Sequence, residues 1–346
     1  MRYFHNDYNA MCHPAVLKKM QDAEKISMPG YGTDEICRKA AERVRALCNN
    51  QSLAVHFLVG GTQANMTVID GALRAHQGVL SADSGHINVH ETGAVEATGH
   101  KVLTLPATDG KISAAQVTAY MENHLSDGDK EHTVQPKMVY ISQSTEWGTT
   151  YNLQELKELS AACKKYGLYL FADGARLGYA LTAKDCDVTL EDLARLTDVF
   201  YIGLTKCGAL FGEAVVISNP ALQEDFRYVI KQHGGMLAKG WLLGLQFEGL
   251  FENDLYFEIT RNANKQADKL RQTLEELGYK LYIPGKTNQV FPILPAALLD
   301  SISGEVTFSP MDWVDEHHRA VRFCTSWATT EEDVNFLCQL LMKHTK

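Results

Sequence analysis

Residues 138–176 read MVYISQSTEWGTTYNLQELKELSAACKKYGLYLFADGAR. The apolar runs at 138–142 (MVYIS) and 168–172 (LYLFA) are typical of buried strands. Between them, residues 153–166 carry apolar side chains at helical spacing, with Asn152 placed to cap the helix and Gly167 to end it. The stretch therefore predicts a strand, a helix and a second strand, the βαβ unit of a parallel sheet.

The same alternation extends over most of the chain. Beyond this unit, the pattern predicts a helix at 190–196 and strands at 198–204 and 213–218. From about residue 53 onward it indicates an α/β fold, with a mostly parallel sheet covered by helices on both faces.

The pattern changes near residue 256. A long helix is predicted at 258–277, ended by Gly278, and strands follow at 279–283, 289–294 and 320–325. Thr329 and Glu332 are predicted to form the capping box of a last helix that reaches Met342. Because 346 residues exceed what one core usually holds, we expect a large domain at 1–255 and a smaller C-terminal domain at 256–346. We also expect the N-terminal segment to contribute to the smaller domain and to a subunit interface.

Composition and charge narrow the classes of function. Apolar residues make up 45% of the chain and charged residues 22%, which is an ordinary globular balance. The net charge of -9, with no run of basic residues, argues against nucleic-acid or anionic membrane partners. The sequence has no signal-like segment at its start and no stretch of apolar residues long enough to cross a bilayer, so we expect a cytoplasmic protein.

The cysteines indicate neither a metal site nor a disulfide framework. No C-x-x-C pair is present, and no histidines stand at zinc-ligand spacing, so no metal is expected and the thiols are interpreted as reduced core residues. The eight cysteines are Cys12, Cys37, Cys48, Cys163, Cys186, Cys207, Cys324 and Cys338. Cys207 follows Lys206 directly, but we assign it no catalytic role.

Polar residues stand where successive predicted strands end: Thr145 with Glu146, then Asp173, then Lys206. In open parallel sheets, ligands bind beyond the carboxyl ends of the strands, so these side chains are expected to converge in one pocket. Lys206 is the candidate amine for an imine with the aldehyde of pyridoxal 5′-phosphate (PLP). Asp173 is the candidate carboxylate that keeps the pyridine nitrogen protonated. Taken separately, a lysine after a strand is more often a solvated loop residue, and a lone D-G is usually a turn.

A candidate phosphate site lies at residues 60–65 (GGTQAN). It follows the strand-like VHFLV and precedes the helical MTVIDGALRA, and backbone amides at a helix start favour a dianion. A plain strand-to-helix turn is the alternative, and the segment is not a P-loop because the Lys-Ser/Thr ending is missing.

The segment 81–94 (SADSGHINVHETGA) contains two histidines and a glutamate among small residues. His86 is a candidate to lie flat on the pyridine ring. On its own, a histidine in such a segment is more often a hydrogen-bonded structural residue.

Together these motifs resemble the threonine aldolases, within the beta-eliminating lyase branch of the fold type I PLP enzymes. The resemblance covers nearly the whole chain, and its motifs are N-D-Y-N (6–9), Y-G-T-D-E-I-C (31–37), G-G-T-Q-A-N (60–65), H-I-N-V-H-E-T-G-A (86–94), A-D-G-A-R-L (172–177), T-K-C-G (205–208) and V-R-F-C-T (321–325). It implies an aspartate aminotransferase-like large domain with a mostly parallel seven-stranded sheet, and a smaller α+β C-terminal domain.

The resemblance also implies roles for individual residues. Lys206 forms the Schiff base, Asp173 pairs with the pyridine nitrogen, and His86 stacks on the cofactor. Gly61, Thr62 and Gln63 hold the phosphate. Arg176 and Arg322 bind the substrate carboxylate, for which guanidinium forks are well suited, and Arg176 also lies at the cofactor. Asn6 is a further substrate-binding residue. Lys231 matches more loosely a positive charge near a phosphate across a subunit interface.

One departure from the family concerns the aldol step. Many members carry an asparagine-threonine-histidine run where this chain has Ser144-Thr145-Glu146-Trp147. Glu146 is a candidate base for the β-hydroxyl, although a carboxylate needs desolvation to replace an imidazole. His90 and Glu91 are the other candidates.

The predicted reaction is retro-aldol cleavage of a β-hydroxy-α-amino acid of the L-threonine or L-allo-threonine type to glycine and an aldehyde. The alternatives are β-elimination or transamination of a small amino acid and, from another class, a PLP-binding regulator or a catalytically silent relative. A homo-oligomer, dimer or tetramer, is expected because such sites are commonly completed by a neighbouring subunit.

Overall fold

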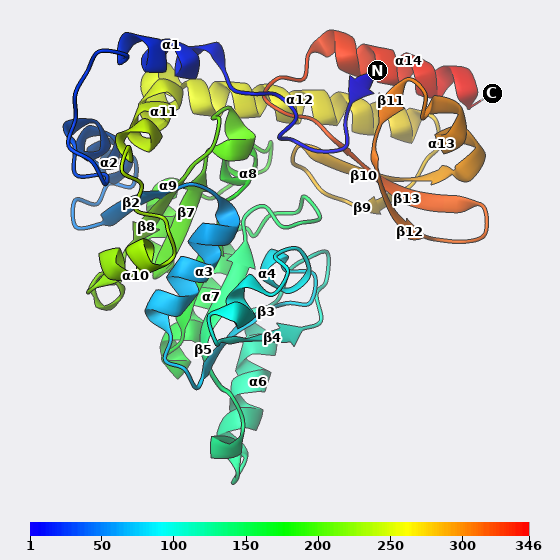
Figure 1. The fold of residues 1–346 in the computed structure, drawn as a ribbon. Coiled ribbons are helices and arrows are strands. Elements are labelled where there is room, and N and C mark those ends of the chain that lie inside the picture. The colour runs from blue at the N-terminus through cyan, green and yellow to red at the C-terminus, as the bar shows by residue number, and fades with distance from the viewer. Residues whose placement is uncertain (346) are drawn as a thin grey trace.

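The predicted βαβ unit is present in the computed structural model, which describes residues 1–345 (Figure 1). It comprises β5 (Gln135–Ser142), α7 (Leu153–Tyr166) and β6 (Tyr169–Asp173), and the two strands pair in parallel. Asn152 caps α7 by accepting a hydrogen bond from the Glu155 amide at 2.9 Å, and Gly167 ends it at a φ of 64°. The predictions for this unit are confirmed.

The unit lies within a mostly parallel seven-stranded sheet, as expected. The strand order is β2 (Ala54–Leu58), β8 (Glu213–Ile217), β7 (Val199–Gly203), β6, β5, β3 (Gln77–Ala82) and β4 (Lys101–Leu105). Only β8 runs antiparallel to its neighbours.

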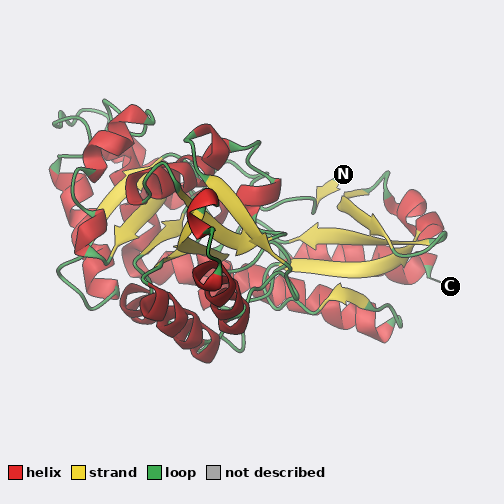
Figure 2. Ribbon diagram, turned by 90° about the horizontal axis from the view of Figure 1, so that it is seen from below, coloured by secondary structure: helices red, strands yellow, loops and turns green. Residues whose placement is uncertain are grey.

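Both faces of this sheet are buried under helices (Figure 2). Along β5, Val139 and Ile141 join one apolar cluster, while Met138 and Tyr140 join the other, as the strand period of two requires. The first face is covered by α1 (Pro14–Asp22), α2 (Glu35–Leu47), α6 (Ala114–Ser126), α7, α8 (Leu177–Leu181), α9 (Leu190–Leu196) and α11 (Trp241–Phe251). The second is covered by α3 (Gly61–Ala72), α4 (His86–Val89), α5 (Ala94–Ala97) and α10 (Phe226–Gln232).

The C-terminal part is built on a separate antiparallel sheet. Its order is β12 (Ser309–Trp313), β13 (His318–Cys324), β10 (Gln289–Pro295) and β9 (Leu281–Ile283). Helices α12 (Leu255–Glu276), α13 (Ala296–Ile302) and α14 (Glu331–His344) accompany it. Near the N-terminus, β1 (Arg2–Tyr3) pairs in parallel with β11 (Val306–Thr307) of this part.

Helix α12 connects the two parts (Figure 1). Tyr256 and Ile259 in its first half belong to the core of the larger part, and Leu270 and Leu274 in its second half belong to the core of the smaller part. The helix begins at Leu255, next to the predicted boundary at 255/256. That boundary remains a proposal, because one continuous helix contributes to both cores.

Two local predictions need correction. The capping box of α14 is formed by Thr330 and Asp333 rather than Thr329 and Glu332. The hydroxyl of Thr329 instead accepts a hydrogen bond from the Ser326 amide at 2.8 Å, so it is engaged in the preceding turn. Helix α3 begins at Gly61, inside the GGTQAN motif rather than after it, and the carbonyl of Gly60 accepts the first helical hydrogen bond, from Ala64, at 3.0 Å.

The cysteines are free and mostly buried, as the sequence predicts. All eight cysteines are free, and all but Cys186 are buried. Among residues 1–345, no helix combines the length and apolarity required to cross a membrane.

Candidate active site

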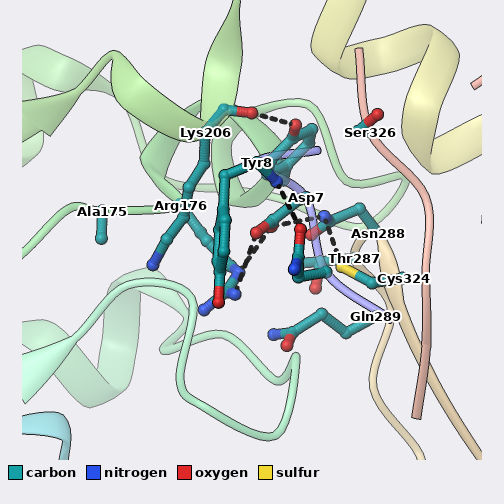
Figure 3. Close-up of polar contacts among 12 residues, drawn as sticks. Asp7, Tyr8, Ala175, Arg176, Lys206, Thr287, Asn288, Gln289, Cys324 and Ser326 are labelled. Carbon is teal, nitrogen blue, oxygen red and sulfur yellow. Dashed lines mark hydrogen bonds and ion pairs between the residues drawn. The ribbon is translucent and has the colours of Figure 1, made fainter. Parts of the chain in front are cut away.

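Lys206 and Asp173 lie at the same edge of the large sheet. Asp173 is the last residue of β6, and Lys206 lies in a 3₁₀ turn (Thr205–Cys207) that follows the neighbouring strand β7. Figure 3 shows the Lys206 side chain extending between Ala175 and Arg176. Burial and the nearby Arg176 guanidinium lower the pKa of Lys206, while the carboxylates of Asp7, Asp173 and Glu213 oppose that change. A lowered pKa increases the fraction of neutral amine, which is the nucleophilic form.

A close backbone approach brings these two residues together. The Gly203 amide donates to the Gly174 carbonyl at 2.9 Å, and a Cβ on Gly174 would lie 1.7 Å from the Tyr201 carbonyl oxygen. A Cβ on Gly203 would lie 2.5 Å from the same Gly174 oxygen. Only glycine fits at either position. Besides permitting a turn, the glycine of the D-G motif therefore lets the chain after β6 approach β7 closely.

Asp173 is held as an anion by its surroundings. Its carboxylate accepts hydrogen bonds from the Tyr140 hydroxyl at 2.5 Å, the Ala175 amide at 2.9 Å and the Asn65 side chain at 3.0 Å. Burial alone would raise the pKa of Asp173, but His86 and these hydrogen bonds outweigh it and lower the pKa. A buried anion at this place suits a protonated pyridine nitrogen.

A chain of hydrogen bonds connects Asp173 to His86. Asn65 donates to Glu91 Oε1 at 2.7 Å as well as to Asp173, and the same Glu91 oxygen lies 2.7 Å from His86 Nδ1. Glu91 and Asn65 are 5% and 0% exposed. Sequence reasoning missed Asn65 and Tyr140, because nothing in their local motifs indicates that they point toward Asp173.

The first turn of α3 forms the candidate phosphate cradle. This helix has no side-chain cap, and a Cβ on Gly60 would meet nothing within 4 Å, so the approach to the first amides is open. Thr62 is exposed at this turn. The Gln63 side chain is already engaged, since it accepts from the Val59 amide at 3.2 Å and donates to the His233 carbonyl at 3.0 Å. At Gln63, therefore, the backbone amide is the group that suits a phosphate.

Glu146 lies beside His86. Its Oε1 accepts hydrogen bonds from the Ser142 hydroxyl at 2.6 Å and from the His86 backbone amide at 3.1 Å. Burial raises the pKa of Glu146, although the Ser142 hydrogen bond opposes this. The His90 ring centroid is 5.6 Å from that of His86. Although the residue is exposed overall, partial desolvation of its ring and the electrostatic influence of His86, Arg322, Arg176 and Lys206 lower the pKa of His90.

The predicted carboxylate-binding residues also lie here, but Arg176 is already paired. Asp7 accepts from Arg176 Nε at 2.7 Å and from Arg176 Nη2 at 3.0 Å, as Figure 3 shows. Arg322 donates to the Gln289 side chain at 3.2 Å and to the His5 carbonyl at 2.9 Å, while its buried Nε has no partner within residues 1–345. Asn6 is 8% exposed, and its side-chain oxygen accepts from the Tyr8 amide at 3.0 Å.

Two remaining expectations concern Lys231 and metal binding. Lys231 is exposed on α10, with its ammonium 5.2 Å from the centroid of the Tyr31 ring. Within residues 1–345, no group of three or more histidine, cysteine, aspartate or glutamate side chains is arranged to hold a metal ion.

Comparison with known proteins decides the family. The beta-eliminating lyase family model matches residues 6–297. The chain belongs to the beta-eliminating lyase family. A solved structure of threonine aldolase from Leishmania major is 44% identical, covers 100% of both chains and superposes with a TM-score of 0.97. A low specificity L-threonine aldolase of Pseudomonas sp. is 30% identical over 96% of this chain and 94% of that protein. A putative L-allo-threonine aldolase from Listeria monocytogenes, at 18% identity and a TM-score of 0.73, shares the fold.

The predicted resemblance and the fold type I architecture are therefore confirmed. Members of the beta-eliminating lyase family are PLP-dependent enzymes. The site contains what PLP requires, namely an amine for its aldehyde, an anion for its pyridine nitrogen and open helix amides for its phosphate. The residues present fit the cofactor.

Proposed function

We propose that this chain is a PLP-dependent aldolase that cleaves a β-hydroxy-α-amino acid, of the L-threonine or L-allo-threonine type, to glycine and an aldehyde. The observation that carries the proposal is the convergence of Lys206, Asp173 and the uncapped start of α3 at one edge of the sheet. The 44% identity to the Leishmania major threonine aldolase, over the whole of both chains, supports the aldol reaction in particular.

The cofactor would be held at three points. Lys206 supplies the amine that binds the aldehyde carbon, Asp173 keeps a proton on the pyridine nitrogen, and the amides of Gly61, Thr62 and Gln63 bind the phosphate. The Glu91 carboxylate fixes the His86 ring through Nδ1, so His86 is oriented to pack on the cofactor ring. When bound, PLP supplies an electron sink for the electron pair released as the Cα–Cβ bond breaks.

Arg322 and Arg176 make different proposed contacts with the substrate carboxylate. Arg322 is the principal contact, because its Nε has no partner within residues 1–345, while Nη1 and Nη2 donate to the Gln289 side chain and the His5 carbonyl. Two of the three nitrogens of Arg176 are committed to Asp7, so Arg176 contributes its remaining Nη1 and positive charge. Asn6, next to Asp7, completes this end of the substrate site.

Glu146 is the proposed base for the β-hydroxyl. The desolvation that a carboxylate needs for this role is present, since burial raises the pKa of Glu146 toward the working range. His90 is the alternative base, because its lowered pKa leaves it neutral and able to accept a proton. Glu91 is less suitable, since its Oε1 already binds both His86 and Asn65.

The test is to incubate the PLP-loaded protein with L-threonine or L-allo-threonine and to assay glycine and acetaldehyde. We expect both products from the wild type and neither from Lys206→Ala. A protein that retains bound PLP, shown by borohydride trapping, yet forms neither product would overturn the aldolase assignment. The family model favours β-elimination as a second candidate, and pyruvate with ammonia from L-serine would identify it. Conversion of PLP to its amine form would identify transamination.

We further propose that the protein is a cytoplasmic homo-oligomer, a dimer or tetramer, that acts on small amino acids. Chemical cross-linking and light scattering of the purified protein measure the assembly state.

A further inference from the structure

Glu213 is a buried carboxyl group that none of the roles above uses. It begins β8, where it lies opposite Gly203 of β7 and Leu58 of β2, and it is 3% exposed. Burying the carboxyl group of a glutamate inside a sheet costs free energy, so its contacts need an explanation.

Those contacts hold the turn that carries Lys206. Glu213 Oε2 accepts from the Leu204 amide at 3.2 Å, and Oε1 accepts from the Thr205 hydroxyl at 2.9 Å. The Thr205 hydroxyl in turn accepts from the Gly212 amide at 3.0 Å. Glu213 therefore ties to β8 both residues that immediately precede the lysine.

The carboxyl group also acts on the lysine through its charge. Burial raises the pKa of Glu213, while the Thr205 hydrogen bond and the positive charge of Lys206 act in the opposite direction and favour the ionised carboxylate. The same attraction favours the protonated form of Lys206. The other ionisable groups that act electrostatically on one or both of them are Asp7, His90, Asp173, Arg176, Tyr201, Cys207 and Tyr256. Among these neighbours, the positive charge of Arg176 disfavours the protonated form of Lys206. The negative charge of Glu213 partly offsets that effect.

We propose that Glu213 is a positioning residue for Lys206, which fixes the turn that carries the lysine and stabilises positive charge on the lysine nitrogen. The inference rests on the proposed PLP site and adds to it a residue that controls the protonation of the lysine-linked cofactor. Because a carboxylate stabilises a nearby cation, it raises the pH at which that nitrogen loses its proton.

The experiment is a pH titration of the visible absorption of the PLP-loaded protein without substrate. Glu213→Gln keeps an acceptor for Leu204 and Thr205 but removes the ionisation. We expect the titration midpoint to fall by about one unit, the scale of a Coulomb interaction between charges several ångströms apart in a protein. Glu213→Asp keeps an ionisable group, so its titration midpoint should lie closer to that of the wild type than the midpoint of Glu213→Gln does.

Asp198 offers a matched control at the opposite end of β7. It is also a structural carboxylate, accepting from the Leu170 amide and the Asn219 side chain, each at 2.7 Å. Asp198→Asn should lower the melting temperature and leave the spectral midpoint unchanged. A Glu213→Gln midpoint equal to that of the wild type, or equal shifts in both amide variants, would overturn the proposal.

Two further outcomes keep the test decisive. If Glu213→Gln does not fold, Glu213→Ala decides, because it also removes the carboxyl group: a lowered midpoint supports the inference, and a midpoint equal to that of the wild type contradicts it. A wild-type protein in which borohydride traps no cofactor on Lys206 overturns the proposed function and this inference together. A wild type that traps PLP with an unmoved Glu213→Gln midpoint overturns the inference alone.

Discussion

Asp7 is the fully buried carboxylate on which the Arg176 guanidinium depends. It accepts two hydrogen bonds from Arg176 and one from the Asn288 side chain at 2.9 Å. Burial alone would raise the pKa of Asp7, but Arg176 and Lys206 lower it from its ordinary value of 3.8 to about 2. Asp7 and Arg176 therefore form a buried ion pair that orients the arginine. Removing either partner would leave the charge of the other uncompensated.

Asp7→Asn should destabilise the protein at neutral pH by about 3–5 kcal/mol, because the buried Arg176 loses its counter-charge. The pKa of Asp7 is lower in the folded state, so its contribution is complete above the ordinary value and is lost as the pH falls through the folded value. We expect about 2 kcal/mol of wild-type stability to be lost in this way between about pH 4 and pH 2, and no such loss in the variant. Urea unfolding of the cofactor-free protein measures both effects.

Glu146 and His90 can be separated as bases by their variants. Glu146→Gln keeps an oxygen for the Ser142 and His86 hydrogen bonds but cannot take a proton, so kcat should fall about 10²–10⁴-fold with cofactor affinity retained. The fall of kcat toward acid pH, which follows protonation of a base with a raised pKa, should disappear with it. His90→Asn is the matched control. A larger loss of kcat in His90→Asn than in Glu146→Gln would assign the proton transfer to the histidine.

At the scale of the elements, the active site depends on how closely β6 and β7 approach. The contacts between Gly174, Gly203 and Tyr201 leave no space for a Cβ, and Asp173 and Lys206 follow directly from the strands so joined. An error in strand spacing here would separate the two groups that we propose to bind the cofactor.

Gly174→Ala should therefore cost more than about 3 kcal/mol of stability, because the added methyl group meets backbone that cannot turn away. The remaining folded protein should show weakened PLP binding. Gly128→Ala is the control, since a Cβ there meets nothing within 4 Å and should change stability by less than about 0.5 kcal/mol. Thermal unfolding and PLP titration compare the two variants; equal stability would refute the packing argument.

The elements also show what a single sequence can and cannot predict. Helix α7 was predictable because its apolar rhythm, the Asn152 cap and the Gly167 end all lie within one local segment. The cap of α14 was displaced by one residue because two adjacent threonines carry the same signal, and a hydrogen bond from the Ser326 amide in the preceding turn engages the first. Asn65, Tyr140 and Asp7 act on residues 33 to 169 positions away in the chain, so no local pattern reports their contacts. The candidate reactive side chains could be proposed from the predicted strand ends, whereas the residues that contact them could be identified only from the coordinates.

For the whole molecule, the proposed substrate end of the site is assembled from the N-terminal segment and both parts of the chain. Arg176 comes from the large part, whereas Asn288 and Arg322 come from the smaller part. In the N-terminal segment, Asp7 contacts Arg176 and Asn288, and the His5 carbonyl contacts Arg322. Phe4 anchors this segment: it is 0% exposed, its amide donates to the Thr307 carbonyl at 3.2 Å, and its ring packs edge-on against Phe323. Substrate binding should therefore depend on a core residue that no substrate touches.

Phe4→Ala tests this dependence. Loss of the buried ring should cost about 3–5 kcal/mol of stability. It should also loosen Asn6 and Asp7, so that KM for the amino acid rises more than the Kd for PLP, whose proposed ligands lie on the large sheet. Tyr3→Ala is the matched control on the adjacent residue, because Tyr3 is 59% exposed and should change stability by less than about 0.5 kcal/mol. Chemical unfolding, PLP titration and initial rates of glycine formation measure the three quantities. A Phe4→Ala protein that is destabilised but has a wild-type KM would show that the N-terminal segment supports the fold without positioning the substrate.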